Sequence, residues 1–180
     1  MKDLNKIIKI LKNDGVGVIP TDTLYGLVGS VFSRVAINRI YKIKNRDKKK
    51  KLIVLISSIK DLEKFGIKHP YKLEYVRMLK KLWPGKVSII LNNIAFRLPA
   101  KKSLIEILKK TGPLVAPSAN PEGMKPAGNI KEAKEYFGDK VDFYLSGGNL
   151  KSDASTLIKI DKKGEVTILR QGGVKIETQR

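Results

Sequence analysis

The chain has 180 residues, 42% of them hydrophobic, no cysteine and a formal net charge of +20 at pH 7. This length predicts a single domain over residues 1–180, with a flexible tail from about Gln171. The lack of cysteine excludes disulfides and thiolate metal sites and favours a cytoplasmic protein. No apolar run approaches the roughly 18 residues of a membrane span, so we expect no membrane partner.

The charge comes from 37 Lys and Arg residues against 17 Asp and Glu residues. A positive field of this size attracts polyanions such as nucleotides and RNA. Two interpretations stay open: contact with RNA through a basic surface, and a lysine-rich composition that serves only solubility. Arginine is scarce in this chain and suits bidentate contacts, so each internal arginine is a separate candidate for contact with a ligand anion.

Apolar periodicity predicts both helices and strands along the chain. Helices are expected over 4–11, 34–44, 59–65, 70–82, 102–111 and 130–137, and strands over 16–19, 52–57, 87–91, 94–98, 114–116, 141–145, 156–160 and 166–169. Ser33 is a suitable N-cap for the second helix. Strands and helices mix without strict alternation, which favours an α/β fold with one mixed sheet flanked by helices.

The first strand ends at Pro20 and is followed at once by Thr21, Asp22 and Thr23. Loops at strand ends in α/β folds commonly bind ligands, because they leave polar groups unpaired. A polar turn without function is the alternative for this stretch alone.

Lys44 and Arg46 stand two residues apart just beyond a predicted helix. An extended backbone there would direct both cations to one side, where they could bracket phosphate oxygens with Lys50 as a third cation. The alternative is a solvated basic loop, since residues 48–51 are all lysine.

Arg97 lies in a strand whose alternate residues are apolar. Its own face also carries Asn93, so this face offers a cation and an amide in place of core packing. A guanidinium in a pocket wall can hold a carboxylate bidentately. The alternative is that Arg97 lies on a strand face at the protein surface.

Further polar residues stand at other strand ends. They are Ser118 and Asn120 after strand 114–116, Ser155 before strand 156–160, and Arg170 after strand 166–169. Each of these residues alone is weak evidence for a site, but together they predict one concave site lined by several strands.

The common nucleotide-binding loops are missing, because neither a Walker-type sequence nor a full dinucleotide fingerprint occurs. The single histidine, His69, is expected at the surface, so a hydrolytic triad and His/Cys metal centres are excluded. Chemistry in this protein must therefore depend on Lys, Arg, Thr, Ser, Asn and the backbone.

Seven motifs in one order give the chain a resemblance to a known family. They are Pro20-Thr21-Asp22-Thr23-Leu24-Tyr25-Gly26-Leu27, Lys44-x-Arg46, Trp83-Pro84-Gly85, Phe96-Arg97-Leu98-Pro99, Ala116-Pro117-Ser118-Ala119-Asn120, Ser155-Thr156 and Leu169-Arg170-Gln171-Gly172. This set resembles the YrdC/Sua5 family in its short form. The resemblance implies a single-domain, twisted mixed β-sheet with a large basic concave cavity.

The resemblance also implies an L-threonylcarbamoyladenylate synthase, a nucleotidyltransferase. Such enzymes make threonylcarbamoyl-AMP and pyrophosphate from L-threonine, bicarbonate or CO2, and ATP with Mg²⁺. A downstream threonylcarbamoyl-transferase complex then modifies adenosine 37 of tRNA. No tightly bound cofactor and no protein metal site are implied.

The family pattern assigns roles to individual residues. L-Threonine is expected at Thr23, Arg97, Ala116 and Ser155; ATP is expected at Lys44, Arg46, Lys50, Asn93, Ser118, Asn120 and Arg170; Lys44 and Arg46 are the catalytic residues. The mechanism needs no protein nucleophile and depends on positioning and charge neutralisation.

Two departures from the family pattern stand out. Asp47 and Lys51 replace prolines around the basic loop, so we expect that loop to be less rigid; residues 126–129 lack the usual hydroxyls.

Two alternatives to the synthase stay open. One is a non-catalytic RNA-binding or ribosome-maturation protein on the same fold, and the other is a carbamoyl-transfer relative of hydrogenase-maturation proteins, which are much longer.

Overall fold

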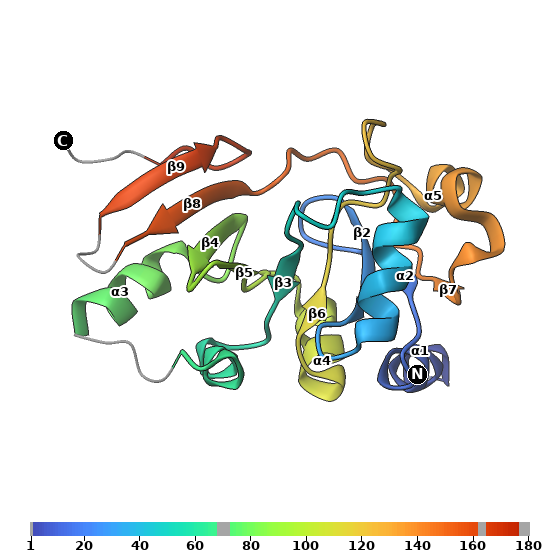
Figure 1. Cartoon of the computed structure of the whole chain (residues 1–180), viewed down its shortest axis with the longest axis horizontal. Helices are drawn as coiled ribbons and strands as arrows, with labels where there is room; N and C mark the ends of the chain where they lie inside the picture. Colours follow the sequence, from blue (N-terminus) through green and yellow to red (C-terminus); the bar gives the residue numbers. More distant parts are fainter. Residues whose placement is uncertain (1, 68–72, 162–164, 177–180) are drawn as a thin grey trace.

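A mixed β-sheet forms the frame of the protein in a computed structural model that describes residues 2–67, 73–161 and 165–176 (Figure 1). Its nine strands follow the order β7-β1-β2-β6-β3-β5-β4-β8-β9. The strands are β1 (Gly17–Pro20), β2 (Tyr25–Ser30), β3 (Ile53–Leu55), β4 (Val87–Leu91), β5 (Ile94–Arg97), β6 (Leu114–Val115), β7 (Phe143–Tyr144), β8 (Thr156–Ile160) and β9 (Val166–Arg170).

Seven helical segments accompany the sheet in the described residues. They are α1 (Lys2–Lys12), α2 (Arg34–Lys44), η1 (Ile59–Phe65), α3 (Leu73–Leu82), α4 (Lys102–Thr111), α5 (Ile130–Phe137) and η2 (Gly138–Lys140), the two η segments being 3₁₀ helices. Within these ranges, no helix has the length and apolar character needed to cross a bilayer. His69 and the expected start of a helix at residue 70 fall outside the described residues, as does the end of the tail.

Parallel and antiparallel neighbours alternate irregularly across the sheet. The pairs β1–β7, β3–β5 and β4–β8 are parallel, and the other neighbouring pairs are antiparallel. The prediction of a mixed sheet flanked by helices is therefore confirmed.

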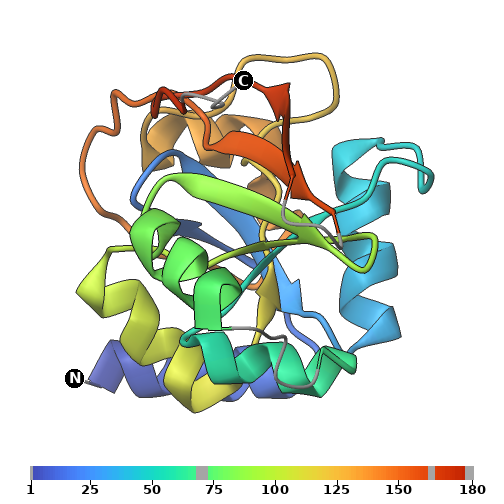
Figure 2. The same cartoon turned by 90° about the vertical axis from the view of Figure 1, so that its left-hand side faces the viewer.

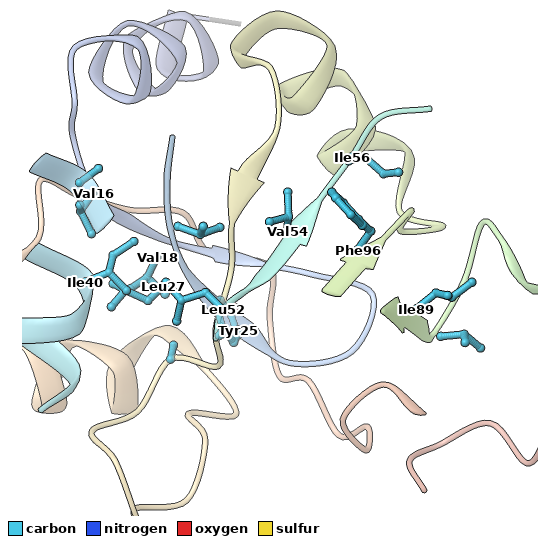
Figure 3. Close-up of a cluster of buried hydrophobic side chains, with 14 of the residues drawn as sticks. Val16, Val18, Tyr25, Leu27, Ile40, Leu52, Val54, Ile56, Ile89 and Phe96 are labelled. Atoms are coloured by element: carbon cyan, nitrogen blue, oxygen red, sulfur yellow. The ribbon is translucent and has the colours of Figure 1, made fainter. Parts of the chain in front are cut away.

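Helices cover both faces of the central strands. Successive residues of one strand point to opposite sides, so that Val18 and Leu27 join one buried cluster while Ile19 and Val28 join the other. The first cluster includes Ile40 of α2 (Figure 3). The second is closed by α1 and α4, which pack side by side along the lower edge in Figures 1 and 2.

Local sequence signals account for several element ends. Ser33 caps α2 by accepting a hydrogen bond of 3.0 Å from the backbone N–H of Ala36, as the sequence predicts. Asn92 and Asn93 both have positive φ, 45° and 65°, and form the tight turn between β4 and β5. This turn fixes the register of β5 and hence the place of Arg97.

One strand, β2, was not predicted, because its sequence Tyr-Gly-Leu-Val-Gly-Ser contains two glycines that weaken the strand pattern. Gly29 has a packing reason: a Cβ atom there would lie 3.0 Å from the Cβ atom of Ala36. Glycine therefore allows α2 to approach β2 closely.

Tyr25 connects this strand to a distant loop. Its side chain is fully buried, and its hydroxyl donates to the carbonyl of Gly148 at 2.8 Å and accepts from the N–H of Gly147 at 2.9 Å. The segment before β8 is thereby held against the strand that carries the Thr-Asp-Thr loop.

Replacing Tyr25 by Phe should destabilise the protein by about 1–3 kcal/mol, because it removes the two hydrogen bonds that join this buried side chain to Gly147 and Gly148. Urea unfolding at constant pH measures this loss. Tyr136→Phe is the matched control, since the Tyr136 hydroxyl donates to the Lys125 carbonyl at an exposed site. An unfolding midpoint equal to that of the wild type would contradict the role assigned to Tyr25.

Candidate active site

Arg97 lies at the end of β5 and meets the loop between β1 and β2. Its Nη1 donates to Thr23 Oγ1 at 2.9 Å, and its Nη2 donates to Asp22 Oδ1 at 2.8 Å. Thr23 Oγ1 also lies 3.0 Å from Thr21 Oγ1, which donates to the Leu24 carbonyl. The alternative of a surface strand face is thus wrong, because Arg97 is only 5% exposed.

The guanidinium of Arg97 retains one unused donor. Its Nε is buried and has no hydrogen-bond partner among the residues that the structure describes. Burial lowers the pKa of Arg97, Asp22 opposes this effect, and nearby Arg170 lowers the pKa further. A buried cation with a free N–H group provides a place for a ligand oxygen, because a partner there would remove the cost of the unpaired donor.

Asp22 belongs to the Pro20–Leu27 motif but was not predicted as a site residue. Besides its ion pair with Arg97, its second oxygen accepts from the Ala100 N–H at 3.1 Å. With Asp22 and Arg97 side by side, this end of the site offers both an anion and a cation. Such a pair complements a zwitterion.

A second group of polar residues joins β4, β8 and β9. Ser88 Oγ lies 2.8 Å from Ser155 Oγ, and Arg170 Nη2 donates to the Ser155 carbonyl at 2.8 Å. Ser88 is fully buried and was not predicted. The charge of Arg170 also lowers the pKa of Arg97, which links this group electrostatically to the first.

Lys44 takes a different conformation from the one predicted. It is the last residue of α2, and Asn45 has a left-handed φ of 50°, so the expected extended backbone is wrong. The Lys44 Nζ donates to the carbonyls of Ser118 and Asn120, both at 2.5 Å. Its assignment to ATP phosphates stays a prediction.

Burial, and to a lesser extent the charge of Arg46, lower the pKa of Lys44 to about 8 against the opposing effect of Glu122. The carbonyl acceptors stabilise the charged form, which therefore predominates at pH 7. A buried ammonium thus holds the segment 118–120 against the end of α2.

Arg46 and Lys50 converge on Glu122. Arg46 Nη1 donates to Glu122 Oε2, and Lys50 Nζ donates to Glu122 Oε1, each at 2.7 Å. These contacts lower the pKa of Glu122, the bond from Lys50 most strongly and that from Arg46 next. Glu122 was not predicted as a site residue. It is an acidic residue in the segment 121–129, which is rich in Gly and Pro, and its presence there in so basic a chain was a usable signal.

The remaining predicted residues are placed by the strands. Ala116 lies near Thr21, because a Cβ atom on Gly26 would be within 3.6 Å of a side-chain carbon of each. Ser118 donates to Asn120 Oδ1 at 2.6 Å. Asn93 is exposed in the β4–β5 turn, where its carbonyl accepts from Lys51 at 2.9 Å, and no hydrogen bond joins its side chain to another site residue in the described part of the chain.

The site therefore consists of a zwitterion-complementary end and a cationic end. The segment 117–119 connects them, because its backbone pairs with β2 just after the Thr-Asp-Thr loop and the Ser118 carbonyl accepts from Lys44. No group of three or more His, Cys, Asp or Glu side chains is positioned for a metal in the described part of the chain. The arrangement can bind an amino acid and a polyanion and neutralise developing charge. It offers no residue in the described ranges arranged as a nucleophile with a histidine base.

The chain is similar to known proteins of one family. The Sua5/YciO/YrdC family model, whose description is telomere recombination, matches residues 9–172. The threonylcarbamoyl-AMP synthase of Aliivibrio fischeri (strain ATCC 700601 / ES114) is 28% identical over 96% of this chain and 100% of its own. That of Cellvibrio japonicus (strain Ueda107) is 30% identical over 80% and 83% of the two chains.

A solved structure gives the same result. The crystal structure of Pyrococcus abyssi Sua5 complexed with L-threonine aligns with a TM-score of 0.83 and 25% identity, over 96% of this chain. Our chain spans about half of that protein, since the alignment covers 54% of it. The family match extends from α1 to just beyond β9, and the chain therefore belongs to the Sua5/YciO/YrdC family.

Proposed function

We propose that this protein is an L-threonylcarbamoyladenylate synthase, which forms threonylcarbamoyl-AMP and pyrophosphate from L-threonine, bicarbonate or CO2, and ATP. The observation that carries the proposal is the buried Arg97, held by Thr23 and Asp22 with its Nε unpaired. The aligned relative was crystallised with L-threonine, an amino acid whose carboxylate suits such a guanidinium.

The amino acid would bind between the Thr-Asp-Thr loop and the ends of the neighbouring strands. Its carboxylate would contact Arg97, and its hydroxyl and methyl groups would lie toward Thr23, Ala116 and Ser155. Asp22 lies where it can attract the ammonium group, which keeps opposite charges adjacent.

The chemistry needs no protein nucleophile. The ammonium group of L-threonine first gives up a proton to water. The neutral amine then forms a C–N bond with CO2 and passes a second proton to water, which gives a carbamate. A carbamate oxygen then forms a bond to the α-phosphorus while the bond from that phosphorus to the β-phosphate oxygen breaks. Pyrophosphate leaves with the electron pair, and the protein contributes positioning and charge neutralisation.

The triphosphate would bind at the cationic end. Arg46 and Lys50 have accessible cationic groups there, and Asn93, Ser118, Asn120 and Arg170 would contact the rest of ATP. Lys44 would act mainly through the segment 118–120 that it holds, so that its contribution to phosphate binding is indirect.

Mg²⁺ belongs to this proposal as the ion that accompanies ATP and neutralises phosphate charge. The product would pass to a threonylcarbamoyl-transferase complex that modifies tRNA in the cytoplasm. We also propose direct contact with RNA through the basic surface, and this part of the proposal rests on the net charge of +20 alone.

Pyrophosphate release from ATP, measured with Mg²⁺ and bicarbonate in the presence and absence of L-threonine, tests the proposal. Release should depend on L-threonine and be weaker with serine or alanine. Release that is independent of any amino acid, or no release at all, would refute it.

Arg97→Lys should raise KM for L-threonine about 10- to 100-fold, because an ammonium cannot replace the bidentate guanidinium. Arg39→Lys is the matched control: Arg39 pairs bidentately with Asp142, a residue outside the proposed site. Threonine titrations of pyrophosphate release give both values. An unchanged KM in Arg97→Lys would exclude the carboxylate contact.

Arg46→Ala should cost about 2–3 kcal/mol of transition-state stabilisation, a fall of about 30- to 150-fold in kcat/KM for ATP. Arg34→Ala, at an exposed position at the start of α2, should change little. Steady-state kinetics at saturating threonine measures both variants. Unchanged turnover in Arg46→Ala would remove this residue from the mechanism.

A further inference from the structure

Glu122 occupies the two cations that the proposed function assigns to the triphosphate. One carboxylate oxygen accepts from Arg46 and the other from Lys50, both at 2.7 Å. Two oxygens on one anionic group, each held by a different cation, is the pattern that phosphate oxygens would form with the same side chains.

The backbone of Glu122 is fixed independently of these ion pairs. Its N–H donates to the Lys44 carbonyl at 2.7 Å, and the Lys44 ammonium in turn holds the carbonyls of Ser118 and Asn120. The carboxylate can therefore leave the cations by rotation of its side chain, while the loop stays in place.

The ion pairs are weak enough to be exchanged. The side chains are 29% exposed for Glu122, 23% for Arg46 and 57% for Lys50. Water can solvate each partner after separation, and exposed ion pairs of this kind contribute little to stability. A triphosphate carries several negative charges and can compete for both cations.

We propose that Glu122 is an internal competitor of the ATP triphosphate: it occupies Arg46 and Lys50 in the ligand-free protein and lowers the affinity for ATP. This inference rests on the proposed function, because it takes these cations as the triphosphate site. Only molecules in which the carboxylate has moved away can bind with full affinity, so the apparent Kd rises by the inverse of their fraction.

The test measures the Kd of ATP with Mg²⁺ by isothermal titration calorimetry for the wild type and three variants. Glu122→Gln removes the charge, and Glu122→Asp keeps it on a side chain one methylene shorter, which cannot bridge both cations from the same backbone position. Glu106→Gln is the control, because it removes a carboxylate that pairs with Lys109 on α4.

Both Glu122 variants should bind ATP about 3- to 10-fold more tightly than the wild type, and Glu106→Gln should not. Adenosine, which lacks phosphates, should bind all four proteins equally. Unchanged urea midpoints would establish that the variants are folded.

Three results would overturn the inference. Weaker ATP binding in Glu122→Gln would mean that the carboxylate organises the cations for the nucleotide. Unchanged binding would mean that it does not compete. Tighter binding in Glu122→Gln but wild-type binding in Glu122→Asp would indicate general charge repulsion in place of occupation of the cations.

Titration with inorganic tripolyphosphate separates this inference from the proposed function. If the Glu122 variants bind tripolyphosphate more tightly but the wild type shows no threonine-dependent pyrophosphate release, the competition stands and the synthase proposal fails. If release depends on threonine but the Glu122 variants bind ATP and tripolyphosphate like the wild type, the synthase stands and the competition fails.

Discussion

The buried guanidinium of Arg97 is the constraint on which the rest of the site depends. A buried charge is costly unless a counter-charge and hydrogen bonds accompany it. Asp22 and Thr23 supply these partners from the loop between β1 and β2, far from β5 in the sheet order. The loop must therefore reach across the ends of the intervening strands, and this places threonine, aspartate and arginine side chains together.

A second buried cation, Lys44, organises the opposite end in a different way. Its partners are backbone carbonyls of Ser118 and Asn120, so it fixes a loop, and within the described ranges no carboxylate forms an ion pair with it. That loop delivers Glu122 to Arg46 and Lys50. One end of the site is thus rigid and internally neutralised, and the other holds exposed cations whose partner can change.

Much of the fold could be predicted because it depends on local signals. The bounds of α4, α5 and β8 agree with the sequence prediction, and the Asn92-Asn93 turn placed β4 and β5 correctly. The strand β2 was missed because glycines that serve packing against α2 also weaken the strand pattern.

The site was predictable as a set of residues but not as a set of contacts. The strand alternation correctly separated Arg97 from the apolar face of Phe96, but Asn93 lies in the β4–β5 turn and does not share the strand face of Arg97. The pairing of Arg97 with Asp22 spans 75 positions of the chain and left no local signal. The helix end near Lys44 was predicted correctly, but the extended backbone expected between Lys44 and Arg46 was wrong because Asn45 takes a left-handed conformation. The bridge from Glu122 likewise depends on tertiary structure.

The central claim is that this site joins threonine, a one-carbon unit and AMP in one molecule. The most direct measurement is mass spectrometry of the adenylate formed from ATP, L-threonine and ¹³C-bicarbonate. The product should be threonylcarbamoyl-AMP that is one mass unit heavier than the product made with unlabelled bicarbonate. An adenylate that contains threonine but no label would show that the amino acid is activated directly and that no carbamate forms.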